Sequence, residues 1–165
     1  MAAVVLHTTA LHRASIPASC TEGLGATTFY LGEPSTLDLV RKSPLIVYGK
    51  AVGHGYLTPG GVPSPDATPE IAVERVLKGR GTRQGEVIRL CRHEGLPVMS
   101  PSVPNYVVAF FVARDGADWV PQDGGLGVVR ADQAGHFDLG RVAQDGGVFE
   151  LEDIAALVDE AVNQR

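Results

Sequence analysis

The chain has 165 residues and a mass of 17.4 kDa, which fits one domain around one hydrophobic core. A hydrophobic content of 44% with 20% charged residues argues against an intrinsically disordered chain. The formal net charge of -5 disfavours a nucleic-acid partner unless basic residues gather on one face, and the longest basic run is the pair Arg41-Lys42. We therefore expect no nucleic-acid partner.

The N-terminal region carries only a weak export signal. The apolar stretch Met1 to Leu6 is interrupted by His7, His12 and Arg13 before it reaches the length of a signal-peptide core. We interpret residues 1–19 as a flexible leader or a degenerate export segment, with a disordered cytoplasmic tail as the alternative. No stretch of the chain approaches the roughly 20 apolar residues of a membrane helix, so we expect no transmembrane segment.

A short helix is predicted over residues 36–42. Ser35 and Asp38 have the spacing of a capping box, in which an N-cap hydroxyl is followed three residues later by an acid. Ser43 precedes Pro44, and a residue before proline avoids the helical conformation, so the helix ends there.

Short apolar runs separated by glycine and proline predict strands over most of the remaining chain. A broken alternation of apolar residues predicts a bulge near Glu74-Arg75. The run Tyr106 to Ala113 has no alternation, which is typical of a central strand buried on both faces. The expected strands span 45–52, 71–77, 87–91 and 106–113, followed by a short segment around Trp119 and a hairpin with flanks 126–130 and 136–139.

A second helix is predicted over residues 151–163. Apolar residues recur at helical spacing, and acids occupy the first turn, where the helix dipole favours them. The apolar residues are Ile154, Leu157, Val158, Ala161 and Val162. The expected fold is therefore mainly β: a small five- to six-stranded antiparallel barrel in residues 20–165, with a short N-terminal helix and an amphipathic C-terminal helix.

The densest reactive cluster is Cys91-Arg92-His93-Glu94. A thiol two residues from an imidazole can hold a metal or activate a nucleophile, but a tetrahedral site needs a second ligand pair, and none is spaced for it. Patterns of serine hydrolases, zinc proteases and phosphate-binding loops are missing. We expect no catalytic residue, cofactor or metal. A metal- or thiol-dependent protein centred on Cys91, His93 and His54 is the alternative.

Two proline-rich loops, 55–69 and 95–105, are the candidate binding regions. His54 and Tyr56, at the start of the first loop, are candidate binding residues, although glycines beside His54 also suit a tight turn. The second loop is expected to expose three apolar side chains that suit a protein partner: Leu96, Val98 and Met99. Tyr106, Phe110 and Phe111 could stack nucleic-acid bases, but no cation is interleaved with them and core packing is the favoured interpretation.

The segment Ser43 to Val52, with Val-Tyr-Gly-Lys at its centre, resembles the first strand of netrin-like modules, the barrel of the tissue inhibitors of metalloproteinases. Glu70 to Gly79, ending in Val-Leu-Lys-Gly, is similar to the second strand. Cys91, followed after a loop by Tyr106 to Phe111, resembles the cysteine before the central strand. Many bacterial proteins share this layout, and the resemblance implies an OB-like five-stranded barrel and a disulfide between Cys20 and Cys91.

The chain departs from the family at its N-terminus. The inhibitors chelate the protease metal with a free N-terminal cysteine, whereas nineteen residues precede Cys20 and Thr21 follows it. The residues themselves leave the two cysteines open: they would be free thiols in the cytosol and could pair after export.

From these observations we expect a non-catalytic protein-binding or accessory module, such as a subunit of a cell-envelope or secreted assembly. It would lie outside the cytoplasm, or in the cytoplasm if residues 1–19 are the native N-terminus. A protease inhibitor of the netrin-like type is a further alternative.

Overall fold

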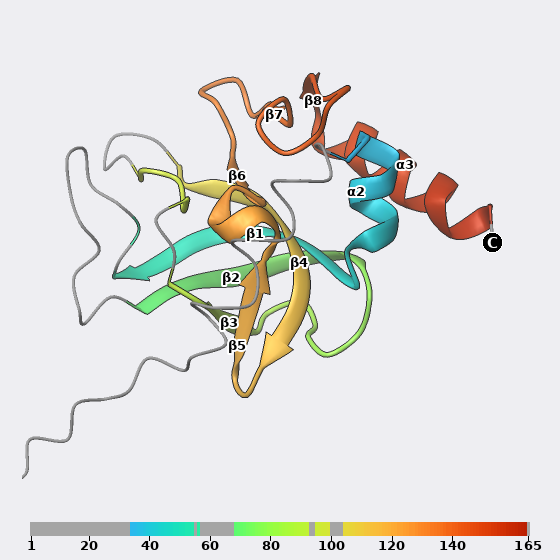
Figure 1. The fold of residues 1–165 in the computed structure, drawn as a ribbon. Coiled ribbons are helices and arrows are strands. Elements are labelled where there is room, and N and C mark those ends of the chain that lie inside the picture. The colour runs from blue at the N-terminus through green and yellow to red at the C-terminus, as the bar shows by residue number, and fades with distance from the viewer. Residues whose placement is uncertain (1–33, 55, 57–67, 93–94, 100–103, 165) are drawn as a thin grey trace, which may run out of the picture.

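The computed structural model describes residues 34–54, 56, 68–92, 95–99 and 104–164 (Figure 1). The predicted leader, Cys20, most of the first proline-rich loop and the pair His93-Glu94 lie outside these described residues.

The described chain forms two α-helices, one short 3-10 helix and eight strands. Both α-helices coincide with the predicted spans. In chain order the elements are α2 (Thr36–Lys42), β1 (Leu45–His54), β2 (Thr68–Lys78), β3 (Val87–Leu90), β4 (Tyr106–Asp115), β5 (Asp118–Pro121), η1 (Gln122–Gly125), β6 (Val128–Arg130), β7 (Phe137–Asp138), β8 (Val148–Phe149) and α3 (Leu151–Asn163).

Five strands close into a barrel in the order β1-β2-β3-β5-β4, and β4 returns to pair with β1. This closed barrel is consistent with an OB-like architecture. The expectation of a purely antiparallel barrel is wrong for one pair, because β3 and β5 run parallel. The reason is geometric: five strands form an odd ring, so when the other four pairings are antiparallel, the last must be parallel.

Strand β4 is buried on both faces, as predicted. Val107, Ala109 and Phe111 point into the barrel, while Val108 and Phe110 belong to a second core outside it, and all five are completely buried. β1 follows the same alternation, because its residues also divide between the two cores. The barrel wall is thus shared by an inner and an outer core.

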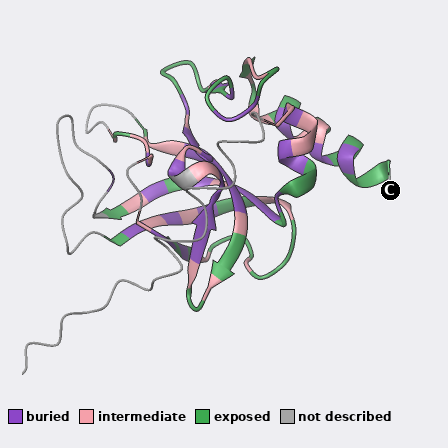
Figure 2. Cartoon of the chain, viewed as in Figure 1, coloured by how far each residue is buried: buried purple, intermediate pink, exposed green. Residues whose placement is uncertain are grey.

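The outer core is covered by the two helices and by the segment from β7 to β8. In Figure 1, α2 and α3 lie side by side at one side of the barrel, and Figure 2 shows buried residues along the strands and along one side of each helix. Ile154, Val158 and Ala161 form this side of α3, and Leu39 and Val40 that of α2. Their spacing is that of an amphipathic helix facing a core.

The bulge predicted near Glu74-Arg75 is present. The register of β2 against β1 shifts between the pairs Tyr48–Arg75 and Gly49–Val73, so Glu74 has no partner across the ladder. A second register shift, which the sequence did not indicate, occurs further along β2 at Leu77, which also has no partner in β1.

The predicted hairpin between residues 126–130 and 136–139 is present only in part. One antiparallel bridge, Ala131 to Phe137, closes the turn just after the first flank, and β7 pairs otherwise with β8. β6 is already paired with β4. The Asp132 carboxylate accepts the N–H groups of Ala134 and His136, both at 2.8 Å, which folds this segment into a compact turn.

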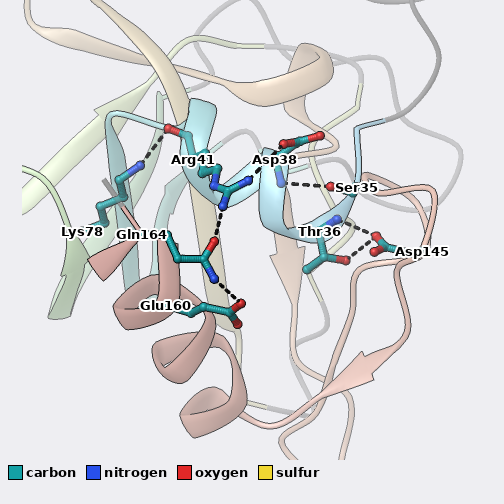
Figure 3. Close-up of polar contacts among 8 residues, drawn as sticks. All are labelled: Ser35, Thr36, Asp38, Arg41, Lys78, Asp145, Glu160 and Gln164. Atoms are coloured by element: carbon teal, nitrogen blue, oxygen red, sulfur yellow. Dashed lines mark hydrogen bonds and ion pairs between the residues drawn. The ribbon is translucent and has the colours of Figure 1, made fainter. Parts of the chain in front are cut away.

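Helix α2 is held at both ends by groups distant in sequence (Figure 3). At its start, the Asp145 carboxylate accepts the hydroxyl and the N–H of Thr36 at 2.9 and 2.5 Å. At its end, the Lys78 ammonium donates to the carbonyls of Val40 and Arg41 at 2.6 and 2.9 Å. A seven-residue helix is unstable alone, so these contacts and the outer core keep it formed.

Asp145→Ala should destabilise the protein at neutral pH but not in strong acid. The N–H of Thr36, and then its hydroxyl, hold the pKa of the Asp145 carboxyl below its ordinary value of 3.8. Because this pKa is lower in the folded state, the stabilisation is complete above pH 3.8 and is lost as the pH falls through the lowered value. Urea unfolding at several pH values measures the effect. The control Asp159→Ala removes an exposed carboxylate, and an equal loss there would contradict the account.

Candidate functional site

A cavity of about 330 Å³ lies between the barrel and the loop 95–98. Its floor is apolar and is formed by Leu126, Val128 and Val129. Charged groups are added to the lining by Arg130 at the end of β6, by Asp138 at the end of β7, and by Arg141 from the turn that follows β7. The cavity therefore lies where the barrel meets the outer layer.

The loop that forms one wall is held in place at two points. Leu96 is 3% exposed and belongs to the inner core of the barrel. The Arg130 guanidinium donates a hydrogen bond of 2.8 Å to the carbonyl of Val98. Gly125 has a φ of 105°, and a side chain there would come within 2.7 Å of the Leu96 nitrogen, so only glycine permits this close approach. The anchored loop leaves Val98 38% exposed beside the cavity.

The charged residues of the lining differ in whether they have hydrogen-bond partners within the described structure. Asp138 accepts the N–H of Gly140 at 2.9 Å, which shapes the turn, and Arg130 is engaged with the loop. Arg141 is exposed and makes no hydrogen bond or ion pair within the described residues. An apolar floor beside an available guanidinium can receive an apolar group that carries a carboxylate nearby.

The prediction that the second loop exposes Leu96, Val98 and Met99 is only partly right. Val98 is exposed, but Leu96 is buried and Met99 is half-buried against the inner core. Leu96 packs inward because the inner core offers an apolar side chain more contact than the surface does. Val98 is the one predicted binding residue that lines the cavity.

Tyr56 is a structural residue instead of a surface one. It is 8% exposed, packs in the inner core, and donates its hydroxyl to the backbone carbonyl of Glu70. Burial, and then the Glu70 charge, raise the pKa of Tyr56 far above its ordinary value, so it stays a neutral donor. His54 is the last residue of β1, and its side chain is not among the described ones.

Cys91 follows directly after β3 and is 3% exposed. Its N–H donates to the carbonyl of Trp119 at 2.9 Å, which extends the parallel β3–β5 pairing. His93 and Glu94, the other chemically reactive members of the predicted cluster, lie outside the described residues. Within the described part, no three histidine, cysteine or acidic side chains are grouped as metal ligands.

The aromatic residues of β4 pack mainly in the two cores, which is the interpretation that the sequence favoured over base stacking. Phe110 and Phe111 are completely buried, one in each core. Tyr106 is half-buried and stacks on Tyr48, with ring centroids 5.5 Å apart and planes 11° from parallel. These two rings line a smaller cavity of about 150 Å³ beside Phe137.

Three lining residues of the cavity beside residues 95–98 were missed by sequence reasoning: Arg130, Asp138 and Arg141. Each stands alone between apolar or turn residues, with no motif around it. Only the packing of the turn after β7 against β6 brings them to one place, and no local pattern could have indicated it.

Comparison with known proteins adds no identity: no protein-family model, curated protein or solved structure matches this chain. No helix in the described part of the chain has both the length and the apolar character required to cross a membrane.

Proposed function

We propose that this protein is a non-catalytic binding module that receives an extended segment of another protein in the cavity beside residues 95–98. The observation that carries this proposal is the combination of an apolar floor, an exposed Val98 and an exposed Arg141 without a partner in the described structure. An apolar surface and a cation in one lining fit a ligand that carries an apolar group close to an anion.

The floor supplies affinity, because each buried CH₂ group of a partner side chain contributes about 0.8 kcal/mol. Arg141 supplies specificity, because a guanidinium favours a carboxylate in a two-pronged geometry. The favoured partner segment therefore places a side chain such as leucine or valine next to aspartate, glutamate or a C-terminal carboxylate.

A protein partner suits this site better than a small metabolite. Val98 lines the cavity and is 38% exposed, so an apolar side chain is available to a partner there. Interfaces combine such an apolar centre with a polar rim, and arginine is enriched in them. The loop is anchored by Leu96 and Arg130, so its wall does not have to be ordered on binding.

Panning of a displayed random peptide library against the purified full chain tests the proposal. We expect enrichment of peptides with an aliphatic residue next to an acidic one or next to a free C-terminus. Arg141→Glu should reduce the affinity of an enriched peptide about tenfold or more, because it replaces an attraction with a repulsion. Fluorescence anisotropy of the labelled peptide gives the affinity.

The matched control is Arg83→Glu, which makes the same charge change at an exposed arginine outside the cavity lining. A motif without acidic character, or equal losses in the two variants, would overturn the proposed site. A library that yields no enriched peptide would overturn the module itself.

The resemblance to netrin-like modules leads to a second part of the proposal: Cys91 forms a disulfide with Cys20, and the protein functions outside the cytoplasm. The closed five-stranded barrel and the C-terminal helix support this resemblance. Cys91 is buried against the barrel, and no cysteine of the described residues is a free thiol. Cys20 is the other cysteine of the chain, and disulfides persist in oxidising compartments.

Intact mass spectrometry of protein from its native source, unfolded in the presence of an alkylating reagent, tests the disulfide. We expect no alkylation without reductant and modification of both cysteines after reduction. The peptide map after proteolysis should contain Cys20 joined to Cys91. Alkylation of both cysteines without reductant would contradict the disulfide and the extracytoplasmic location, while leaving the cavity proposal intact.

A further inference from the structure

A second cavity, of about 590 Å³, is lined by cations. It lies where the C-terminal end of α2, the end of β2 and the last turns of α3 come together. Every charged residue of its lining is basic: Arg41, Lys42, Lys78 and Arg80. This gathering stands out in a chain whose formal net charge is -5.

Two of these cations are held in place by backbone and side-chain contacts (Figure 3). Lys78 donates to the carbonyls of Val40 and Arg41 at the end of α2. Arg41 donates to the side chain of Gln164, and its ion pair with Asp38 is long, at 3.9 Å, and exposed. Positive charge at the C-terminal end of α2 is favoured by the helix dipole. This gives Arg41 and Lys78 a structural role, but it does not explain the other two cations of the lining.

The other two cations, Lys42 and Arg80, are exposed and have no hydrogen bond or ion pair in the described structure. Arg80 is brought to the cavity by a glycine. Gly79 has a φ of 96°, and a side chain there would lie 2.1 Å from the Pro44 carbonyl oxygen, so the turn after β2 approaches the end of α2 closely. Four cations are thereby gathered around one opening, two of them held by hydrogen bonds and two exposed.

Acids lie close by but do not neutralise this cavity. Asp38 has the long contact to Arg41, and Glu160 accepts a hydrogen bond from Gln164 at 2.8 Å. Neither belongs to the lining. Neighbouring cations repel one another, and a bound anion reduces that repulsion.

We propose that this basic cavity binds a compact ligand that carries two or more phosphate groups. A single carboxylate would satisfy one arginine, whereas neighbouring phosphates carry several charges and acceptor oxygens in a small volume and can contact all four cations. The site is separate from the cavity beside residues 95–98 and does not depend on the function proposed for it.

Isothermal titration of the full chain with inorganic tripolyphosphate at low salt tests this inference. We expect one binding site per chain, with an affinity that weakens as salt screens the charges. The variant Lys42→Gln/Arg80→Gln should bind about tenfold more weakly, because it removes two charge-assisted contacts. Neither side chain has a partner in the described structure, so the fold should be retained, which circular dichroism checks.

The matched control is Lys50→Gln/Arg83→Gln, which lowers the net charge equally at exposed cations outside the cavity lining. Unchanged binding by this control supports a specific site. Equal weakening in both variants would show attraction by overall charge and overturn the proposal, as would absence of tripolyphosphate binding. Binding of a single-stranded oligonucleotide but not of tripolyphosphate would overturn it in favour of nucleic acid.

The source of the phosphate groups is distinguished in a further titration. Vesicles of phosphatidylcholine with a phosphoinositide bisphosphate present the same chemistry on a surface. Competition of soluble tripolyphosphate with vesicle binding, lost in Lys42→Gln/Arg80→Gln, would identify a lipid headgroup as a ligand of this site. Tripolyphosphate binding without vesicle binding supports a soluble ligand.

Discussion

The structure depends on a single strand, β4, whose two faces belong to two hydrophobic cores. Val107, Ala109 and Phe111 fill the barrel, and Val108 and Phe110 fix the outer layer against it. Both sets are fully buried, so neither core can be lost without exposing half of the same strand. Along its edges β4 also pairs with β1, β5 and β6, which closes the barrel.

Joining a barrel to a helical layer creates a seam, and the three cavities described above lie along it. The cavity at residues 95–98 lies between β6 and the turn after β7, and the basic cavity lies between β2 and the two helices. The small tyrosine-lined cavity has β4 on one side and the start of α3 on the other. Ligand sites between two packed parts are common, because the parts cannot match perfectly there. The two binding sites that we propose therefore both lie along this seam.

Sequence patterns were sufficient wherever the signal was local. Ser35, Ser43 and Pro44 mark both ends of α2, and the acids at the start of α3 with its apolar spacing place the second helix. The unbroken apolar run of β4 predicted burial on both faces.

Features that depend on tertiary contacts could not be predicted in this way. Leu96 and Tyr56 stand in proline- and glycine-rich segments that resemble surface loops, yet both reach the inner core. Arg41 and Lys42 form only a short basic run in the sequence. The end of β2 returns to the end of α2 and adds Lys78 and Arg80 to them, which the linear sequence does not show. The parallel β3–β5 pair follows from closing an odd number of strands, which no single segment shows.

Native-state hydrogen exchange tests most directly whether the barrel and its outer layer form one cooperative unit through β4. The account predicts that the most protected amides of β4 and of α3, such as those of Phe110 and Val158, exchange with the same opening free energy, equal to that of global unfolding. Exchange of α3 at a clearly lower free energy, with β4 still protected, would contradict it. The helical layer would then detach on its own, and cavities along the seam would not be preformed.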